Sequence, residues 1–185
     1  MQAGLAVFAA EGFAASKLDD VADKAGVAKG TIYLYFRDKE DLFEQIVRDA
    51  VGPVISQLES IAQAPDLPAD LVLKALFDLF RTEVLETPRK YVLRLVITEA
   101  PRFPALAEFY HREVVSRGLS HIGQLLRRFS AKGELATARA ANFPQLVFAP
   151  LLMAVIWDSL FARIDPLDVE GLLAAHRELL LGNAK

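Results

Sequence analysis

The stretch that decides the fold runs from residue 18 to residue 36, and it reads Leu18-Asp19-Asp20-Val21-Ala22-Asp23-Lys24-Ala25-Gly26-Val27-Ala28-Lys29-Gly30-Thr31-Ile32-Tyr33-Leu34-Tyr35-Phe36. Its first eight residues place apolar side chains at helical spacing, and Gly26 follows them, where a left-handed residue can turn the chain sharply. In the next eight residues, Ile32 and Phe36 fall on one side of a helix and Thr31 and Leu34 on the other. The pattern predicts two short helices, 18–25 and 29–36, joined by a tight turn.

Helices are also expected on either side of this stretch. A first, short helix should end at Gly12, because glycine readily adopts the conformation that terminates helices. Ser16 and Asp19 have the spacing of a capping box for the helix 18–25. Asp38 is expected to cap a fourth helix. The fourth helix turns a set of apolar side chains toward the core, namely Leu42, Phe43, Ile46 and Val47.

Helical periodicity continues to the end of the chain, without a run of alternating apolar and polar residues that would indicate a sheet. Longer helices are expected over residues 54–63, 71–85, 89–100, 104–132, 138–161 and 167–181. Pro150 lies inside one of them, and we expect a kink there. The sequence therefore predicts an all-α protein with an N-terminal three-helix, helix-turn-helix domain (1–45) and a larger helical domain (46–185).

Composition excludes several classes of protein. The chain is 53% apolar and 24% charged, as is usual for a folded globular protein, and it has no cysteine, which excludes disulfides, thiol nucleophiles and cysteine-ligated zinc. Without a basic N-terminal region or an apolar run of about 18 residues, we expect a cytoplasmic protein that does not enter the membrane. The net charge is −3, and residues 1–48 carry six basic and eight acidic side chains. This acidity argues against nucleic-acid binding, although a few well-placed cations can still hold phosphates.

The stretch from Gly4 to Phe43 resembles the TetR family of tetracycline-repressor-like regulators. The matching segments are Ala9-Ala10-Glu11-Gly12-Phe13, Val21-Ala22-Asp23-Lys24-Ala25-Gly26-Val27, Lys29-Gly30-Thr31-Ile32-Tyr33-Leu34-Tyr35-Phe36 and Lys39-Glu40-Asp41-Leu42-Phe43. The resemblance implies that 18–25 is the supporting helix and 29–36 the recognition helix of a DNA-binding motif. The family usually has a basic arm and a longer first helix before the position of Gly4, whereas only three residues precede it in this sequence. Either the sequence is shortened here or this member lacks the arm, and both would reduce the affinity for DNA.

The resemblance also implies which side chains touch DNA. In the family, the positions of Thr31, Tyr33 and Tyr35 commonly contact DNA, and that of Lys39 grips a phosphate. Small residues at Gly30 and Thr31 suit a helix that enters the major groove. The expected DNA-binding set is Lys17, Lys29, Gly30, Thr31, Tyr33, Leu34, Tyr35 and Lys39. The serine that often caps the recognition helix is Ala28 here, so that cap is absent.

The larger domain is expected to bind a small molecule and to form the dimer. In TetR-like proteins the last two long helices pair across a two-fold axis, and the segment 138–161 is apolar on all sides, which requires burial on all sides. Aromatic walls with few polar groups suit a ligand pocket. The candidate ligand-binding residues are Phe80, Tyr91, Arg94, Glu99, Tyr110, Met153 and Trp157, most of which could equally be core or interface residues. The effector itself is not indicated.

Other functions are less well supported. The three histidines, His111, His121 and His176, lack metal-ligand spacing, so no metal or other cofactor is expected. The chain shows no phosphate-binding loop, zinc motif or nucleophile elbow, so we do not expect an enzyme. The principal expectation is a regulator that binds a double-stranded DNA operator as a homodimer, with repression implied by the resemblance. The alternative is a helical adaptor that binds proteins through residues 143–161 without affinity for DNA.

Overall fold

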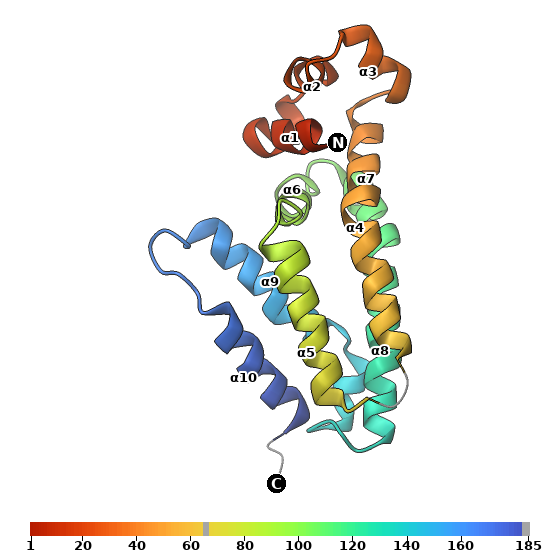
Figure 1. The fold of residues 1–185 in the computed structure, drawn as a ribbon, viewed down its shortest axis with the longest axis vertical. Helices are drawn as coiled ribbons and strands as arrows, with labels where there is room; N and C mark the ends of the chain where they lie inside the picture. The colour runs from red at the N-terminus through yellow and green to blue at the C-terminus, as the bar shows by residue number, and fades with distance from the viewer. Residues whose placement is uncertain (65–66, 183–185) are drawn as a thin grey trace. The chain divides into compact units, whose positions relative to one another are not determined.

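The computed structural model describes residues 1–64 and 67–182, and these residues form helices and no strand (Figure 1). The predicted all-α class is confirmed. The helices follow one another as α1 (Gln2–Ala15), α2 (Leu18–Ala25), α3 (Lys29–Tyr35), α4 (Lys39–Gln63), α5 (Ala69–Phe80), η1 (Arg81–Leu85), α6 (Lys90–Glu99), α7 (Pro104–Tyr110), η2 (His111–Val115), α8 (Ser116–Ala131), η3 (Ala138–Asn142), α9 (Gln145–Leu160) and α10 (Val169–Leu181). The elements η1 and η2 are π-helical turns, and η3 is a 3₁₀ helix.

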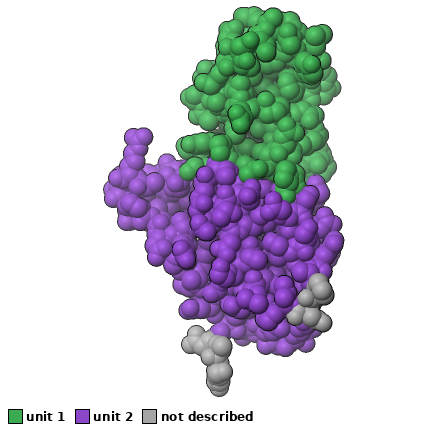
Figure 2. Space-filling view, in the orientation of Figure 1, with its two compact units in different colours: residues 1–53, 88–114 green, residues 54–87, 115–185 purple. Residues whose placement is uncertain are grey.

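The chain forms two compact units, which Figure 2 shows in green and purple. Unit 1 comprises residues 1–53 and 88–114, and unit 2 comprises residues 54–87 and 115–185. The segment 88–114, which carries α6 and α7, therefore packs with the N-terminal helices, although it lies beyond the expected domain boundary at residue 45. That boundary, which separates DNA binding from ligand binding, stays a prediction about function.

The core of unit 1 is built around aromatic rings. Phe13 lies at its centre, with ring centroids 5.3 Å from Phe8, 6.0 Å from Phe43 and 5.0 Å from Phe103. The helices α6 and α7 contribute four buried residues to this core, namely Val92, Leu95, Leu106 and Phe109. The helix-turn-helix segment thus shares one hydrophobic core with α6 and α7, and removing them would expose apolar surface that normally contributes to stability.

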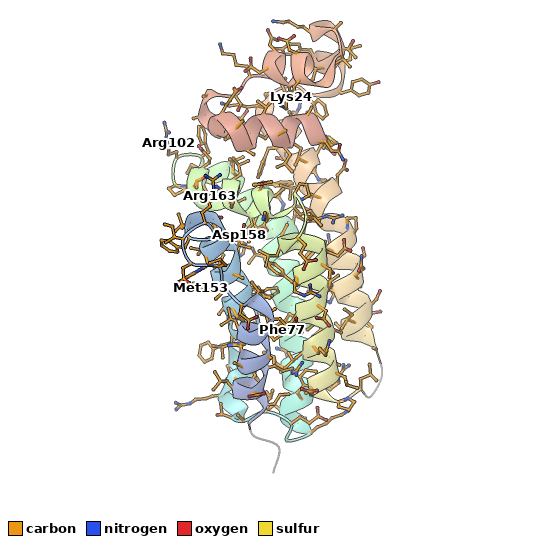
Figure 3. All side chains as sticks on the ribbon, turned by 60° about the vertical axis from the view of Figure 1, so that its left-hand side comes forward. Lys24, Phe77, Arg102, Met153, Asp158 and Arg163 are labelled. Atoms are coloured by element: carbon orange, nitrogen blue, oxygen red, sulfur yellow. The ribbon has the colours of Figure 1, made fainter. Side chains whose placement is uncertain are left out.

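Unit 2 packs α5, α8, α9 and α10 around a second core. Phe77 on α5 lies inside this unit, as Figure 3 shows, and it is almost fully buried. Leu73 on the same helix is buried as well, and the facing helices contribute Ile122, Leu126, Phe129, Leu151 and Leu173. Nearly every apolar position on α5 and α8 that faces inward is a leucine, isoleucine, valine or phenylalanine, as expected for a packed helical core.

Two predicted helix boundaries are wrong. The segment 54–63 is not a separate helix, because α4 continues through Pro53, which lies inside it. A proline removes one backbone hydrogen bond, but buried residues on both sides of it, such as Val47 and Val54, keep the helix in register. The predicted helix 138–161 is divided into η3 and α9. Pro144 lies between them and has no N–H group to extend a preceding helix.

Local features at the start of the chain agree only in part with the predictions. Gly12 (φ 76°, ψ 160°) interrupts α1 as expected, but one further helical turn extends to Ala15. The predicted capping box of Ser16 and Asp19 is wrong by one residue, because the backbone N–H of Lys17 donates to the Asp20 carboxylate at 2.9 Å. The Asp38 carboxylate accepts from the Asp41 N–H at 2.8 Å, which confirms the predicted cap of α4.

Within the described ranges, no helix is long and apolar enough to cross a membrane.

Candidate nucleic-acid interface

The turn between α2 and α3 has the predicted form. Gly26 is left-handed, with φ 68° and ψ 29°, and its N–H lies at the C-terminus of α2, 3.2 Å from the Asp23 carbonyl oxygen. The N–H of Val27 donates to the Ala22 carbonyl at 3.1 Å, which completes the end of the helix. The first turn of α3 has no side-chain cap at Ala28, as the sequence indicates. The two helices end and begin within one residue of their predicted bounds.

The outer face of α3 is exposed and largely apolar. Ile32 is buried in the core of unit 1, whereas the side chains of Tyr33, Leu34 and Tyr35 are 54%, 83% and 74% exposed. Thr31 is exposed as well, and a Cβ placed on Gly30 would meet no atom within 4 Å. Packing within the chain therefore does not require a glycine at position 30, because a larger side chain would fit there. A close approach by a ligand as large as DNA would explain a glycine at this position.

Two of the predicted DNA-binding residues contact a carboxylate of the preceding helix. The Lys29 ammonium donates to Asp19 Oδ2 at 2.8 Å, and the Tyr33 hydroxyl donates to Asp19 Oδ1 at 3.1 Å. The hydrogen bond from Lys29 holds the pKa of Asp19 below its usual value, and the same bond raises the pKa of Lys29. The bond to Asp19 also raises the pKa of Tyr33. At neutral pH the three groups are a carboxylate, an ammonium and a neutral phenol.

Lys39 has two backbone partners within unit 1. Its ammonium donates to the carbonyl oxygens of Phe13 at 2.8 Å and Ala14 at 2.9 Å, at the C-terminal end of α1. It also lies 4.8 Å from the ring centroid of Phe13 and 5.6 Å from that of Phe103. The structure thus gives Lys39 a role in holding α1, and its expected contact with a phosphate stays a prediction. Lys17, in contrast, is an exposed residue at the start of α2.

Asp19 is the residue that the sequence analysis missed at this surface, since it was considered only as part of a cap. One signal in the sequence could have identified Asp19. Helical spacing places it on the polar side of α2, at the N-terminal end of that helix, where it can meet side chains of the next helix. Contacts between residues 10 and 14 positions apart depend on the angle of the turn at Gly26, which periodicity does not specify.

The candidate ligand-binding residues are divided between the two units. Unit 1 contains Tyr91, Arg94, Glu99 and Tyr110. The Arg94 guanidinium lies 5.6 Å from the centroid of the Tyr91 ring. One Glu99 oxygen lies 3.1 Å from the position of a Cβ on Gly12, and the other is buried with no hydrogen-bond partner among the described residues. Burial raises the pKa of the Tyr110 phenol to about 12.

Unit 2 contains Phe80, Met153 and Trp157. Phe80 packs against the core, and Met153 extends to the outside of α9, where it is labelled in Figure 3. The Trp157 ring N–H donates to the Asp165 carbonyl at 2.6 Å, and its ring centroid lies 5.1 Å from that of Phe161. These contacts hold Trp157 against the segment that follows α9. That the seven residues line one ligand cavity stays a prediction.

Within residues 1–64 and 67–182, no three acidic or histidine side chains are grouped so that they could hold a metal ion. His176 has a structural contact between two helices of unit 2. The His176 ring nitrogen Nε2 lies 2.7 Å from the Leu146 carbonyl, to which its N–H donates, so that it joins α10 to α9.

The helix-turn-helix with an exposed second helix, followed by a helical unit, defines the class of DNA-binding transcriptional regulators. Two family profiles match the chain: "Bacterial regulatory proteins, tetR family" over residues 1–46, and "AefR-like transcriptional repressor, C-terminal domain" over residues 72–170. The chain belongs to the TetR family of bacterial transcriptional regulators, with a C-terminal domain of the AefR-like type. The resemblance noted from the sequence is confirmed, and the chain is a transcriptional regulator and not an enzyme.

Individual relatives agree with this assignment. The transcriptional regulator YhgD of Bacillus subtilis is 36% identical over 183 residues, covering 95% of this chain and 91% of that protein. The fatty acid metabolism regulator protein of B. subtilis is 39% identical over 59 residues, so the match spans only 30% of its length and 32% of this chain. The crystal structure of FadR from B. subtilis in complex with stearoyl-CoA has the same fold, with a TM-score of 0.77 and 22% identity over 100% of this chain and 97% of that one.

Proposed function

We propose that this protein is a repressor that binds a palindromic operator in double-stranded DNA as a homodimer, in the cytoplasm, and is released by a small-molecule effector. The exposed face of α3 is the observation that carries the proposal. It provides Gly30 and Thr31 for a close approach to the groove, and Tyr33, Leu34 and Tyr35 for contacts with base edges and sugars.

The chemistry of these side chains fits the major groove. Hydroxyl groups of threonine and tyrosine can donate or accept hydrogen bonds at base edges and phosphates, and an apolar side chain can contact a thymine methyl group. Leu34 is 83% exposed next to the exposed Tyr33 and Tyr35, and a contiguous exposed apolar patch usually marks a surface that has a partner. A DNA contact supplies that partner. Lys17 and Lys29, at the N-terminal ends of α2 and α3, are the candidates for contacts with phosphates.

An apolar face on α9 supports the dimer. Leu146, Leu152, Met153 and Leu160 are all exposed, with Ala149 between them, and their spacing puts them on one side of the helix. A monomer would leave this face in water, and contiguous exposed apolar surface usually marks an interface. On α10, Leu179 is exposed as well. A second copy that uses the same face gives a closed two-fold dimer with one recognition helix per half-site.

The effector is proposed to act by binding one arrangement of the dimer better than the other. The two affinities are linked: if the effector lowers the affinity for DNA by a given factor, then DNA lowers the affinity for the effector by the same factor. Because one relative is named for fatty acid metabolism and the fold is shared with a protein solved in complex with stearoyl-CoA, long-chain acyl thioesters are the first compounds that we would test. The seven ligand-binding candidates in the two units are the residues to substitute when a compound is found.

The test is binding of the purified protein to a pool of genomic fragments at two salt concentrations, followed by affinity measurements on the enriched site. We expect a near-palindromic site whose affinity falls steeply with salt. Thr31→Ala and Tyr35→Ala should each weaken operator binding by about three- to tenfold, since a single hydrogen bond contributes about 0.5–1.5 kcal/mol. Leu71→Ala, which truncates an exposed apolar residue on α5, should leave the affinity unchanged.

Two results would contradict the proposal. Wild-type protein that enriches no site would favour the adaptor, and capture of a protein partner through residues 143–161 would then be sought. Retained affinity in both α3 variants, with helicity and dimerisation intact, would show that another surface reads the DNA.

A further inference from the structure

Asp19 uses both oxygens of one carboxylate on two side chains of the recognition helix. Lys29 Nζ lies 2.8 Å from one oxygen, and Tyr33 Oη lies 3.1 Å from the other. Lys29 and Tyr33 are four residues apart on α3, so they lie one helical turn apart on the same face. This is the flank of α3 that borders α2, between the buried side of Ile32 and Phe36 and the outer face of Thr31 and Leu34. In the free protein, therefore, an acid of α2 occupies the polar groups of two DNA-binding residues.

The pair with Lys29 is formed but easily opened. The side chain of Lys29 is 57% exposed and that of Asp19 is 36% exposed, so water screens their attraction, and such pairs contribute little to stability. Both groups are nevertheless ionised, because the contact lowers the pKa of Asp19 and raises the pKa of Lys29. A phosphate carries the same charge as Asp19, so a phosphate that replaces it offers Lys29 little net gain.

We propose that Asp19 is a specificity-determining residue, which keeps Lys29 and Tyr33 paired on random DNA and releases them only when α3 is seated on the operator. The inference rests on the proposed function. On random DNA, binding depends almost entirely on phosphate charges, and a paired Lys29 adds no contact. On the operator, contacts of Thr31, Leu34 and Tyr35 with the bases fix the helix in place, and Lys29 then reaches a phosphate. Asp19 thus lowers non-specific affinity more than operator affinity.

The proposal predicts different salt dependences for the two kinds of complex. Removing the charge of Asp19 frees Lys29 to contact a phosphate on random DNA, which steepens the slope of log affinity against log salt by about 0.9. At about 0.1 M salt this one additional contact corresponds to a gain of about five- to tenfold in non-specific affinity. On the operator Lys29 already has its phosphate, so the slope stays the same. The ratio of operator to non-specific affinity falls accordingly.

The experiment compares Asp19→Asn with Asp23→Asn, on the operator and on a scrambled duplex of equal length, over a series of salt concentrations. Asp23 is an exposed acid on the same helix and has no hydrogen bond to Lys29 or Tyr33, so its substitution removes the same charge without opening the pair. A double variant, Asp19→Asn with Lys29→Met, tests whether the gain passes through Lys29. Thermal unfolding of each variant confirms that unit 1 is folded.

We expect Asp19→Asn to raise the affinity for the scrambled duplex and to steepen its salt slope, and we expect the double variant to lose both effects. Equal gains in Asp19→Asn and Asp23→Asn would overturn the inference, because the effect would then be one of net charge alone. Unchanged binding of Asp19→Asn to the scrambled duplex would overturn it too, while operator binding by the wild type leaves the proposed function intact. Wild-type protein that binds no operator would overturn both.

Discussion

Lys39 is a half-buried cation that holds the last carbonyl groups of α1, 26 residues earlier in the chain. Replacing it with methionine keeps the length of the side chain but removes two hydrogen bonds from a charged donor. We expect Lys39→Met to lower the free energy of unfolding by about 2 kcal/mol, since bonds from charged groups typically contribute 1.5–3 kcal/mol. Unfolding in urea, followed by circular dichroism, measures the change.

The matched control is Lys24→Met, which removes an exposed lysine on α2, labelled in Figure 3. It should change the free energy of unfolding by about 0.5 kcal/mol or less, since Lys24 interacts mainly with the end of its own helix. If Lys39 serves only to grip a phosphate, Lys39→Met will match this control in stability and will instead reduce the salt slope of DNA binding by about 0.9.

The recognition helix α3 begins without a side-chain cap. Ala28 has no side-chain oxygen to accept from the N–H groups of the first turn, and the Thr31 N–H donates to the backbone carbonyl of Ala28 at 2.8 Å. Ala28→Ser supplies that acceptor, and we expect it to raise the free energy of unfolding by about 1 kcal/mol. Urea unfolding measures the gain, and Ala28→Val, which changes the size but adds no acceptor, is the control. A gain of equal size in both variants would contradict the explanation by capping.

At the level of helices, the sequence predicted those helix positions and ends that depend on residues close to one another in the chain. The periodicity of 18–25, the glycine after it and the apolar positions Ile32 and Phe36 were sufficient to place α2 and α3. The sequence did not predict that α4 continues through Pro53, because a proline usually breaks a helix. Residues such as Val54 are buried in the tertiary core, and this burial favours the continuous helix. The sequence did not predict the division at Pro144 either, because the apolar pattern is continuous across it.

The candidate interface shows the same limit at the scale of side chains. The exposed residues Tyr33, Leu34 and Tyr35 follow from helical geometry and the family pattern together. The partners of Lys29 and Lys39 do not, because they are Asp19, 10 residues away, and backbone carbonyls of Phe13 and Ala14. Such contacts are set by the angle between helices, and no local pattern in a single sequence encodes that angle.

At the scale of the molecule, the exposed apolar face of α9 predicts that the protein is a dimer in solution. Leu152→Glu places a charge in the middle of this face, where an interface would have to bury it without a partner. We expect the variant to sediment as a monomer at concentrations where the wild type is a dimer, as measured by analytical ultracentrifugation. Binding to a palindromic operator should weaken with it, because a single recognition helix reads only one half-site.

Ile97→Glu provides the comparison, since Ile97 is a similarly exposed apolar residue on α6 in unit 1. It should leave the protein dimeric. A monomeric wild type, or a Leu152→Glu variant that stays dimeric, would show that the face of α9 is used for something else.

The chain enters and leaves unit 1 more than once, because residues 54–87 intervene between its two segments, 1–53 and 88–114. A DNA-reading head of this kind cannot be transplanted as one contiguous cassette. A chimaera that joined only the first 45 residues to another sensor would leave behind Val92, Leu95, Leu106 and Phe109, which complete the head's core. Exchange of operator preference between such regulators, in evolution or in biosensor engineering, therefore has to proceed by changing the surface of α3 or by grafting two segments together.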